Sequence, residues 1–474
     1  MMLLMPKRQK YKLLFIALVF LYTGLFALNK KVSIQDILDK KYTTKLSSKK
    51  LFMQQVSNLS YDEQDKFMLG FSFYRIPWVE APSATTARDG LGPLFSANTC
   101  ISCHPNNAIA SIYNDKGNIS RAYVARLSIP SDGSKTHEDY LKYKGFIPEP
   151  TYGGQISLNA AHGVPFEAKN QIIYDKKIVT YPDGREVILS SPKNDQASAL
   201  KDLSYGKLHK NTAITKRLAP ALVGLGLLDM LNDEQILANQ DINDSNNDGI
   251  SGKANIVYSP EFEDFRVGRY TWKGSTASVL HQSGAAAHND MSLSNPLFPN
   301  ENCTKSQKEC LKAPKGDNGR VSSKFDLPME RLEAIAFYLK NLKIPKSKIT
   351  EKSGERLFSQ IGCTSCHIPE FTLANGYKIK PFTDILLHDM GEGLSDGRVE
   401  FKAGKNEWRT PALWAIGKYK FATGKEPELL HDGRAKTLEE AILWHGGEGD
   451  MSRKRFMNLT KEHRDEVLRY ISQL

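Results

Sequence analysis

The chain has 474 residues, 40% of them hydrophobic and 25% charged, a composition ordinary for globular proteins. A chain of this length is too long for one small core, so two folded domains are expected. Lysine and arginine exceed aspartate and glutamate by 64 to 53, which gives a formal charge of +11. This excess favours an acidic protein partner or an anionic membrane surface. Because basic residues are spread among acidic ones without a long basic block, a nucleic-acid partner is not expected.

The N-terminal segment has the pattern of a targeting element. Basic residues between Lys7 and Lys12 precede an uncharged apolar run from Leu13 to Leu28. The run fits a signal peptide or a minimal membrane anchor, and the absence of an A-x-A cleavage pattern near Ala27 favours the anchor. We therefore expect residues 1–30 to export the chain, leaving its body in the periplasm, free or tethered to the inner membrane.

Two similar stretches indicate a repeat of domains. The segment FMLGFSF from Phe67 leads towards one cysteine pair, and GERLFSQIG from Gly354 leads directly into another. Each pair is followed much later by apolar residues at helical spacing, at 329–342 and at 461–474. The sequence therefore predicts two units, each with an opening helix, a cysteine motif and a closing helix.

Both cysteine pairs belong to C-x-x-C-H motifs, CISCH at 100–104 and CTSCH at 363–367. In this motif two thiols form thioethers with the vinyl groups of a haem, and the histidine is the proximal iron ligand. Zinc would need four ligands from paired motifs, and a redox dithiol would not need the histidine in both copies. The sequence thus predicts two haem c groups, haem 1 on Cys100, Cys103 and His104, and haem 2 on Cys363, Cys366 and His367.

The predicted fold class is mainly α, with two cytochrome c-like haem domains. After a polar, lysine-rich linker over 31–50, the N-terminal domain covers 51–345 and the C-terminal domain covers 346–474. The first domain holds a large insertion over 105–325. Its clusters of Gly, Pro, Asn and Asp and its short apolar runs indicate a mixed α/β region with many loops.

The second axial position of each iron decides between an electron carrier and a peroxidase. The sequence alone does not select the ligand. Candidates downstream of the second motif are His388, Met390, His431, His445 and Met451. Candidates for the first haem are His137, His162, His281, His288 and Met291.

Two smaller patterns suggest further sites. Asp244, Asn246, Asp248 and Ile250 alternate around a glycine as in a calcium loop, although the twelfth position is an asparagine and a plain Asx-rich turn is the alternative. Cys303 and Cys310 are the remaining cysteines, and in an oxidising compartment they are expected to form a disulfide rather than a redox-active pair.

His431, Asp432 and Arg434 cluster on a turn that contains a glycine. They could stabilise haem propionates or assist cleavage of a peroxide, or they could form a structural turn. No carboxylate identifies itself as a distal acid or base, and Glu167 is a guess for that role.

Several long strings resemble one bacterial family. They are LAPALVGLGLLDML, DSNNDGISGKAN, LLHDMGEGLSDG, EWRTPALWAIG and LLHDGRAKTLEEAILWHGGE, and they run in family order between about Asp65 and the C terminus. The family is that of the di-haem oxidoreductases, also labelled thiol-oxidoreductase-like cytochromes c. It is distantly similar to di-haem cytochrome c peroxidases and to the di-haem enzyme that oxidises tryptophans of methylamine dehydrogenase.

The resemblance implies roles for particular residues. His445 stands where the peroxidases place the methionine ligand of the C-terminal haem, which would make haem 2 bis-histidine with a lowered potential. For haem 1, similarity to the segment NDM points to Met291, with His281 and His288 close behind. The peroxidases place a tryptophan between their haems, and Trp272 is the candidate here. They also hold calcium between the haem domains.

Three functions follow from these patterns. The first is a peroxidase-like oxidoreductase that reduces hydrogen peroxide, or another small oxidant, with electrons from a small and acidic donor such as a cytochrome c. The second is an electron-transfer cytochrome without substrate chemistry. The third is an oxidase of a protein partner or of a metal ion, like the methylamine dehydrogenase maturation enzyme.

Overall fold

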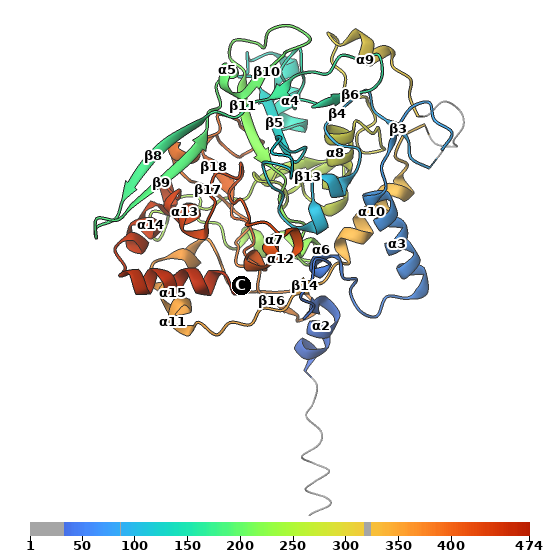
Figure 1. Ribbon diagram of the computed structural model, residues 1–474. Coiled ribbons are helices and arrows are strands. Elements are labelled where there is room, and N and C mark those ends of the chain that lie inside the picture. The colour runs from blue at the N-terminus through green and yellow to red at the C-terminus, as the bar shows by residue number, and fades with distance from the viewer. Residues whose placement is uncertain (1–32, 86, 317–323) are drawn as a thin grey trace, which may run out of the picture.

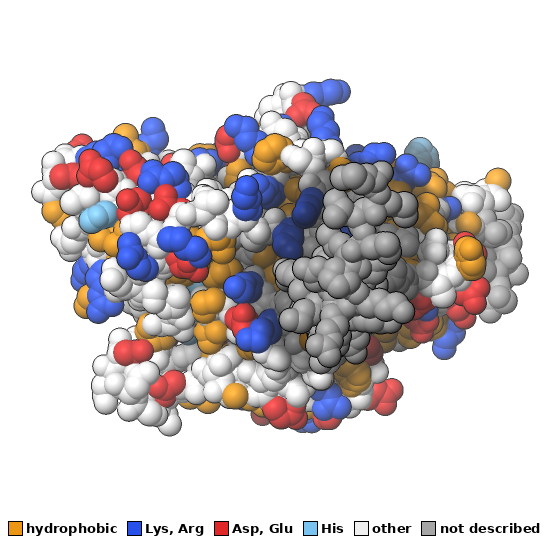
Figure 2. Space-filling model, turned by 90° about the horizontal axis from the view of Figure 1, so that it is seen from below, with side chains coloured by type: hydrophobic (Ala, Val, Ile, Leu, Met, Phe, Trp, Pro, Cys, Tyr) orange, Lys and Arg blue, Asp and Glu red, His pale blue; other side chains and the backbone are white. Residues whose placement is uncertain are grey.

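The computed structural model describes residues 33–85, 87–316 and 324–474. The targeting segment expected over residues 1–30 lies outside them. Among the described residues, no helix is both long enough and apolar enough to cross a membrane. On the face shown in Figure 2, basic, acidic and hydrophobic side chains are interspersed rather than gathered by type.

The helices of the described chain are mostly short. They are α2 (Ile34–Tyr42), α3 (Tyr61–Arg75), α4 (Lys135–Tyr143), α5 (Gln196–Ala199), α6 (Leu225–Asp229), α7 (Asp233–Leu237), α8 (Val279–Met291), α9 (Lys308–Lys312), α10 (Met329–Lys340), α11 (Lys352–Gln360), α12 (Tyr419–Thr423), α13 (Leu438–Leu443), α14 (Asp450–Met457) and α15 (Lys461–Ile471).

The strands pair two by two into small sheets. The pairs are β1 (Thr43–Thr44) with β14 (Ile344–Pro345), β2 (Val79–Glu80) with β3 (Asp89–Leu91), β4 (Leu94–Phe95) with β6 (Asn159–Ala160), β5 (Tyr123–Ser128) with β11 (Ala213–Leu218), β7 (Lys169–Asn170) with β10 (Leu200–Lys201), β8 (Tyr174–Thr180) with β9 (Glu186–Pro192), β12 (Ile256–Ser259) with β13 (Asp264–Val267), β15 (Phe371–Thr372) with β16 (Lys378–Ile379), and β17 (Leu387–Asp389) with β18 (Glu407–Arg409).

The prediction of a mainly α fold is wrong. Of the described residues only 32% are helical, and 18% are strand in many small sheets. The reason lies in the long region between α3 and α10, where turn-forming residues break the chain into hairpins, loops and, apart from α8, short helices. Helical periodicity is visible in the sequence only where a helix lasts several turns.

The helices α3 and α10 pack across each other (Figure 1). The Ser60 side chain begins α3 by accepting a hydrogen bond from the Glu63 backbone, while Glu63 reaches back to Ser60 in a capping box. Gly70 allows the close crossing, because a Cβ at this position would lie 1.8 Å from the Ala334 carbonyl oxygen. Around it, the rings of Phe67 and Tyr338 lie 5.0 Å apart.

The helices α11 and α15 repeat this arrangement. Gly354 meets the Glu466 carbonyl, where a Cβ would lie 2.2 Å from the oxygen, and the rings of Phe358 and Tyr470 lie 5.4 Å apart. Each crossed pair thus combines a glycine with aromatic rings. The repeat expected from the sequence is present in the helix pairs, and the cysteine motif follows the opening helix each time, directly in the second copy.

Two expected boundaries take a more ordered form. Residues 31–50, expected as a linker, contain α2 and β1, and Ser33 caps α2. Thr43 of β1 pairs in parallel with Ile344 of β14, so the expected linker contacts the segment at the boundary between the two expected domains. The remainder of the domain division stays a prediction.

The long hairpin of β8 and β9 reaches across to the C-terminal helices (Figure 1). Val179, Tyr181 and Leu189 share a buried cluster with residues of α11, α13 and α15. The Tyr181 hydroxyl donates to Glu439 at 2.7 Å. The region expected as an insertion therefore belongs to the same packed body as the second haem motif.

Candidate functional site

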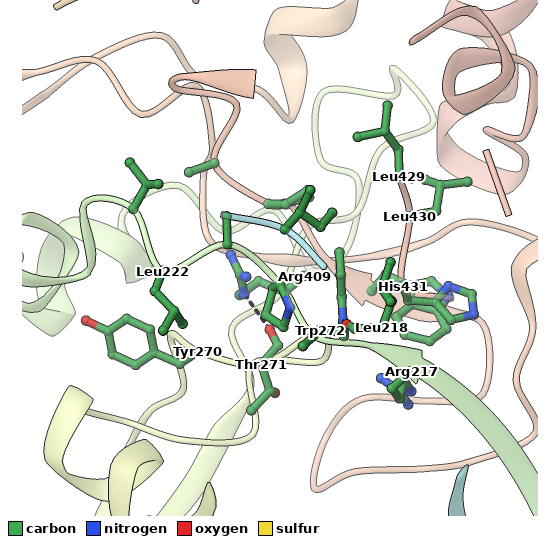
Figure 3. Close-up of a pocket in the computed structure, with 18 of the residues that line it drawn as sticks. Arg217, Leu218, Leu222, Tyr270, Thr271, Trp272, Arg409, Leu429, Leu430 and His431 are labelled. Carbon is green, nitrogen blue, oxygen red and sulfur yellow. Dashed lines mark hydrogen bonds between the residues drawn. The ribbon is translucent and has the colours of Figure 1, made fainter. Parts of the chain in front are cut away.

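One cavity of about 440 Å³ reaches both cysteine motifs. Its wall includes Cys100 and Cys103 from the first motif and Cys363 and Cys366 from the second. All four are unpaired thiols at partly buried positions, as thioether formation requires. Figure 3 shows the middle of this cavity.

His104 follows the short 3-10 helix of the first motif, Cys100–Ser102, which Thr99 caps. Its Nδ1 lies 2.9 Å from the carbonyl oxygen of Pro220. A carbonyl can only accept, so Nδ1 carries the proton and Nε2 is left with a free lone pair. Burial lowers the pKa of His104, which keeps the ring neutral and able to bind a metal.

His367 repeats this geometry in the second motif. Its Nδ1 donates to the carbonyl oxygen of Phe382 at 2.9 Å, and burial lowers its pKa to about 4. Both motif histidines are therefore held by a backbone carbonyl in the tautomer that offers Nε2 to iron.

His445 is a third imidazole of the same kind. It follows α13, lines the cavity, and donates from Nδ1 to the carbonyl oxygen of Ala441 at 2.7 Å. Burial lowers its pKa, and it is close enough to His367 to lower the pKa of that ring as well. The structure thus brings together two imidazoles beside the second motif.

The cavity wall on the first side is formed by one face of α8. Gln282, Ser283, Ala286, Asp290 and Met291 face it. The buried Ser283 hydroxyl has no hydrogen-bond partner in the described chain. These residues are small or uncharged apart from Asp290. On this side α8 therefore offers the sulfur of Met291 as a possible iron ligand, but no imidazole.

His281 and His288 lie on the other face of α8. Their rings stack on Phe298, with centroids 6.0 Å and 5.6 Å away, and neither residue is among those that line the cavity in the described chain. Their placement favours Met291 over both histidines as the candidate ligand of haem 1.

Trp272 lies between the two halves of the cavity. In Figure 3 its indole stands between Leu222 and Tyr270 on one side and Leu429 to His431 on the other. The ring is fixed by a hydrogen bond of 2.8 Å from Nε1 to the carbonyl oxygen of Leu218, the last residue of β11. Its role between two haems stays a prediction.

Arginines give the cavity wall a positive charge. Six arginines line it, against three carboxylates: Arg121, Arg126, Arg217, Arg269, Arg409 and Arg453 against Asp290, Glu400 and Glu448. Three of these arginines form ion pairs, Arg217 with Asp396 and Glu400, Arg269 with Asp233, and Arg453 with Asp450. Arg409 donates to the carbonyl oxygens of Thr271 at 3.0 Å and Thr410 at 2.9 Å, and burial lowers its pKa to about 10. Within the described residues no carboxylate forms an ion pair with Arg409, so its charge is free for an anionic group of a ligand.

The comparisons with known proteins agree with this geometry. Residues 41–474 match the family described as "Di-haem oxidoreductase, putative peroxidase". The chain belongs to this family. No curated protein matches it. A chain of xenon-pressurised hydrazine synthase from Kuenenia stuttgartiensis matches with 19% identity over 36% of this chain and 63% of that one, but a TM-score of 0.23 carries no argument.

Haem is the cofactor of this family, and the residues present fit it. Two sets of free thiols, proximal imidazoles with an available Nε2, and the Arg409 guanidinium, which has no carboxylate ion pair among the described residues, match the vinyl groups, the iron and a propionate of haem. Motif reasoning found the thiols and the histidines. The arginines were missed, because they come from separate segments and share no pattern.

The turn that contains His431 is buried beside this cavity. The ring of His431 stacks on Trp408 with centroids 3.8 Å apart, and its Nε2 has no hydrogen-bond partner in the described chain. Burial lowers the pKa of His431 to about 3, so it is neutral. Burial would raise the pKa of Asp432, but His431 and Arg434 lower it to about 2. Of the three, only His431 lines the cavity, which leaves Asp432 and Arg434 as a buried ion pair behind it.

His388 takes a role that the sequence did not reveal. Its Nε2 lies 2.7 Å from an Asp384 oxygen and its Nδ1 lies 2.6 Å from a Glu448 oxygen. Burial would lower its pKa, but the hydrogen bonds to Asp384, Cys366 and Glu448 raise it to about 12. A cation with both nitrogens occupied is not an iron ligand. Glu448 lies 60 residues from His388 in the sequence, and no local pattern predicts that the two side chains are in contact.

The loop expected to bind calcium is an exposed turn. Asp244 accepts hydrogen bonds from the backbone of Asp248 at 2.9 Å and Gly249 at 3.1 Å, and Asp248 accepts from Ile250 at 2.9 Å. These are the bonds of Asx turns, which also shape calcium loops. Calcium binding stays a prediction.

Three further residues, Cys303, Cys310 and Glu167, are not among those that line the cavity. Cys303 and Cys310 form a disulfide, with Cα atoms 5.8 Å apart. Glu167 is buried, and burial raises its pKa to about 8. It accepts hydrogen bonds from Ser157 and Gln307 and is not among the cavity-lining residues, so the guess that it is a distal acid has no support.

Proposed function

We propose that the protein is a peroxidase-type di-haem oxidoreductase that works outside the cytoplasm. Haem 1 reacts with hydrogen peroxide, and haem 2 takes electrons from a small donor such as a cytochrome c. The observation that carries the proposal is the unequal setting of the two motifs. A second imidazole, His445, stands beside the second motif, whereas α8 presents a small and mostly uncharged wall to the first.

Haem iron supplies the electron transfer and the activation of peroxide, and the axial ligands decide which haem does which. The protein would close the sixth position of haem 2 with His445 and so suit it to electron transfer alone. Gln282 and Ser283 give polar atoms to the pocket over haem 1. Trp272 lies between the two halves of the cavity, where its ring would shorten the distance of each electron-transfer step between the haems.

The second candidate is an electron-transfer cytochrome with two closed haems. Met291 favours it, because this methionine is buried and its side chain lines the cavity on the side of haem 1. A methionine ligand there would leave no position for peroxide unless it moved away.

The decisive experiment is stopped-flow spectroscopy of the holoprotein, fully ferric and half-reduced, mixed with hydrogen peroxide and then with a reduced small cytochrome c. Rapid change of the haem spectrum followed by catalytic oxidation of the donor supports peroxidase activity. Unchanged low-spin spectra in both redox states would contradict it and favour the electron carrier. Met291→Leu separates the two cases, because it opens haem 1 to peroxide only if Met291 is a ligand.

The donor and the location are part of the same proposal. A protein with formal charge +11 attracts an acidic donor, so catalytic rates with such a donor should fall as salt is added. The basic and apolar N-terminal segment supports export to the periplasm.

A further inference from the structure

His388, Asp384 and Glu448 form a buried chain of three charges beside haem 2. The imidazole of His388 stands between the two carboxylates, at 2.7 Å from Asp384 and 2.6 Å from Glu448. The exposed fraction of the His388 side chain is 3%, that of Asp384 is 2% and that of Glu448 is 11%. Buried ions at these distances hold each other firmly, since separating them would leave a charge unpaired.

One end of this chain is fixed to the attachment motif of haem 2. The Sγ of Cys366 lies 3.6 Å from Nδ1 of His388. The backbone N–H of Asp384 donates to the Cys366 carbonyl at 3.0 Å, and the Asp384 side chain accepts from Leu386 at 2.9 Å. Asp384 and His388 therefore move together with the motif that bears the haem.

The other end is fixed to the turn that follows His445. Glu448 lies on the 3-10 helix Gly447–Gly449, three residues after His445. It also accepts from the Ser251 N–H at 3.1 Å, from the Ser251 hydroxyl at 3.0 Å and from the Asp389 N–H at 3.2 Å. Gly447 lets the turn approach β17, because a Cβ there would lie 2.2 Å from the Asp389 carbonyl oxygen.

We propose that Glu448 and His388 are positioning residues that hold His445 against the iron of haem 2. The proposal rests on the proposed function, in which His445 is the sixth ligand of that haem. The hydrogen bond of His445 itself goes to Ala441 of α13 and not to the second haem motif. The contact between the turn after His445 and that motif is made by Glu448, which lies three residues further along the chain and binds His388. Loosening this contact would let exogenous ligands compete with His445.

The test is the rate at which cyanide displaces the sixth ligand of haem 2 in the ferric holoprotein. Loss of the EPR signal of the bis-imidazole low-spin centre reports haem 2 alone. A hydrogen bond between ions contributes enough that its loss changes an equilibrium roughly tenfold or more. Glu448→Gln and His388→Gln should therefore accelerate displacement about tenfold or more and raise the potential of haem 2. Glu392→Gln is the matched control, because Glu392 is an exposed carboxylate on the 3-10 helix Glu392–Leu394 that accepts a hydrogen bond from Asn406 at 3.1 Å.

The outcomes are distinct. Wild-type displacement rates and potentials in both variants, with haem 2 low-spin, would overturn the positioning role and leave the proposed function intact. A wild-type haem 2 without a bis-imidazole signal would overturn both. If Glu448→Gln fails to fold, Ser251→Ala removes one donor to Glu448 and should give a smaller acceleration in the same direction. An unchanged rate in Ser251→Ala with fully loaded haem would then contradict the proposal.

Discussion

The Nδ1 of His445 lies 2.7 Å from the carbonyl oxygen of Ala441, one helical turn earlier. This bond fixes the tautomer, so the Nε2 lone pair of His445 is available in a cavity that His367 also lines. His104 and His367 are held by carbonyls in the same way. Three imidazoles are thus held in the tautomer that leaves Nε2 available.

Replacing His445 should change haem 2 and leave haem 1 as it is. In His445→Met, a thioether replaces an imidazole, which stabilises the ferrous state and raises the potential within the roughly 0.8 V range that axial ligands span. Spectroelectrochemical titration, which resolves two one-electron steps, measures this shift. His288→Met is the control on the outer face of α8. Equal potentials in wild type and His445→Met would show that His445 is not a ligand.

Replacing Trp272 should slow electron transfer between the haems. The indole of Trp272 occupies the space between the two halves of the cavity, and Trp272→Phe removes both the larger ring and the bond to Leu218. After rapid reduction of haem 2, the rate at which the electron equilibrates with haem 1 should fall several-fold. Trp444→Phe, at a buried tryptophan outside the cavity wall, should leave that rate unchanged. An unaltered rate in Trp272→Phe would exclude it from the path.

Removing the charge of Arg409 should lower the potential of the nearer haem. A partly buried cation that forms no ion pair with a carboxylate of the described chain stabilises the reduced state, and its loss near a haem is worth on the order of 0.1 V. Arg409→Met should show this fall, and Arg409→Lys, which keeps the charge, should show little of it. Potentiometric titration of both variants, at equal haem content, makes the comparison. A fall of the same size in both would assign the effect to geometry rather than charge.

The haem attachment sites were predictable because they are local. C-x-x-C-H places the thiols and the imidazole within five consecutive residues, so no tertiary knowledge is needed. The helix pairs were visible for a similar reason, since periodic apolar residues mark α10 and α15. Their predicted ends ran two or three residues too far, because the last apolar residues pack on the core beyond the helix end.

The parts that escaped prediction depend on contacts between distant segments. Arg409 and Glu448 come from separate regions and line one cavity only when the chain folds. His388 was considered a possible iron ligand because a sequence does not show that two carboxylates occupy its nitrogens. The predicted fold class was wrong because the composition of the chain does not reveal its hairpins. Hairpins such as β8–β9, which exposes many of its side chains, are determined by the residues of their turns.

His388 should make the stability of the protein depend on pH on the alkaline side. Burial alone would lower its pKa from 6.5, but the hydrogen bonds to Asp384, Glu448 and the free Cys366 thiol raise it to about 12. In the holoprotein, where the Cys366 sulfur is a thioether, the two carboxylates still raise the pKa. A raised pKa contributes stability that is fully present below the unfolded pKa and is lost as pH rises towards the folded pKa. Between pH 8 and 10 the wild type should therefore lose up to about 1.4 kcal/mol of unfolding free energy per pH unit through this group. His388→Gln lacks the group, so the difference in stability between wild type and variant should shrink as pH rises. Guanidinium unfolding of both holoproteins at pH 8, 9 and 10 measures it, and parallel curves would mean that His388 is not held as a cation.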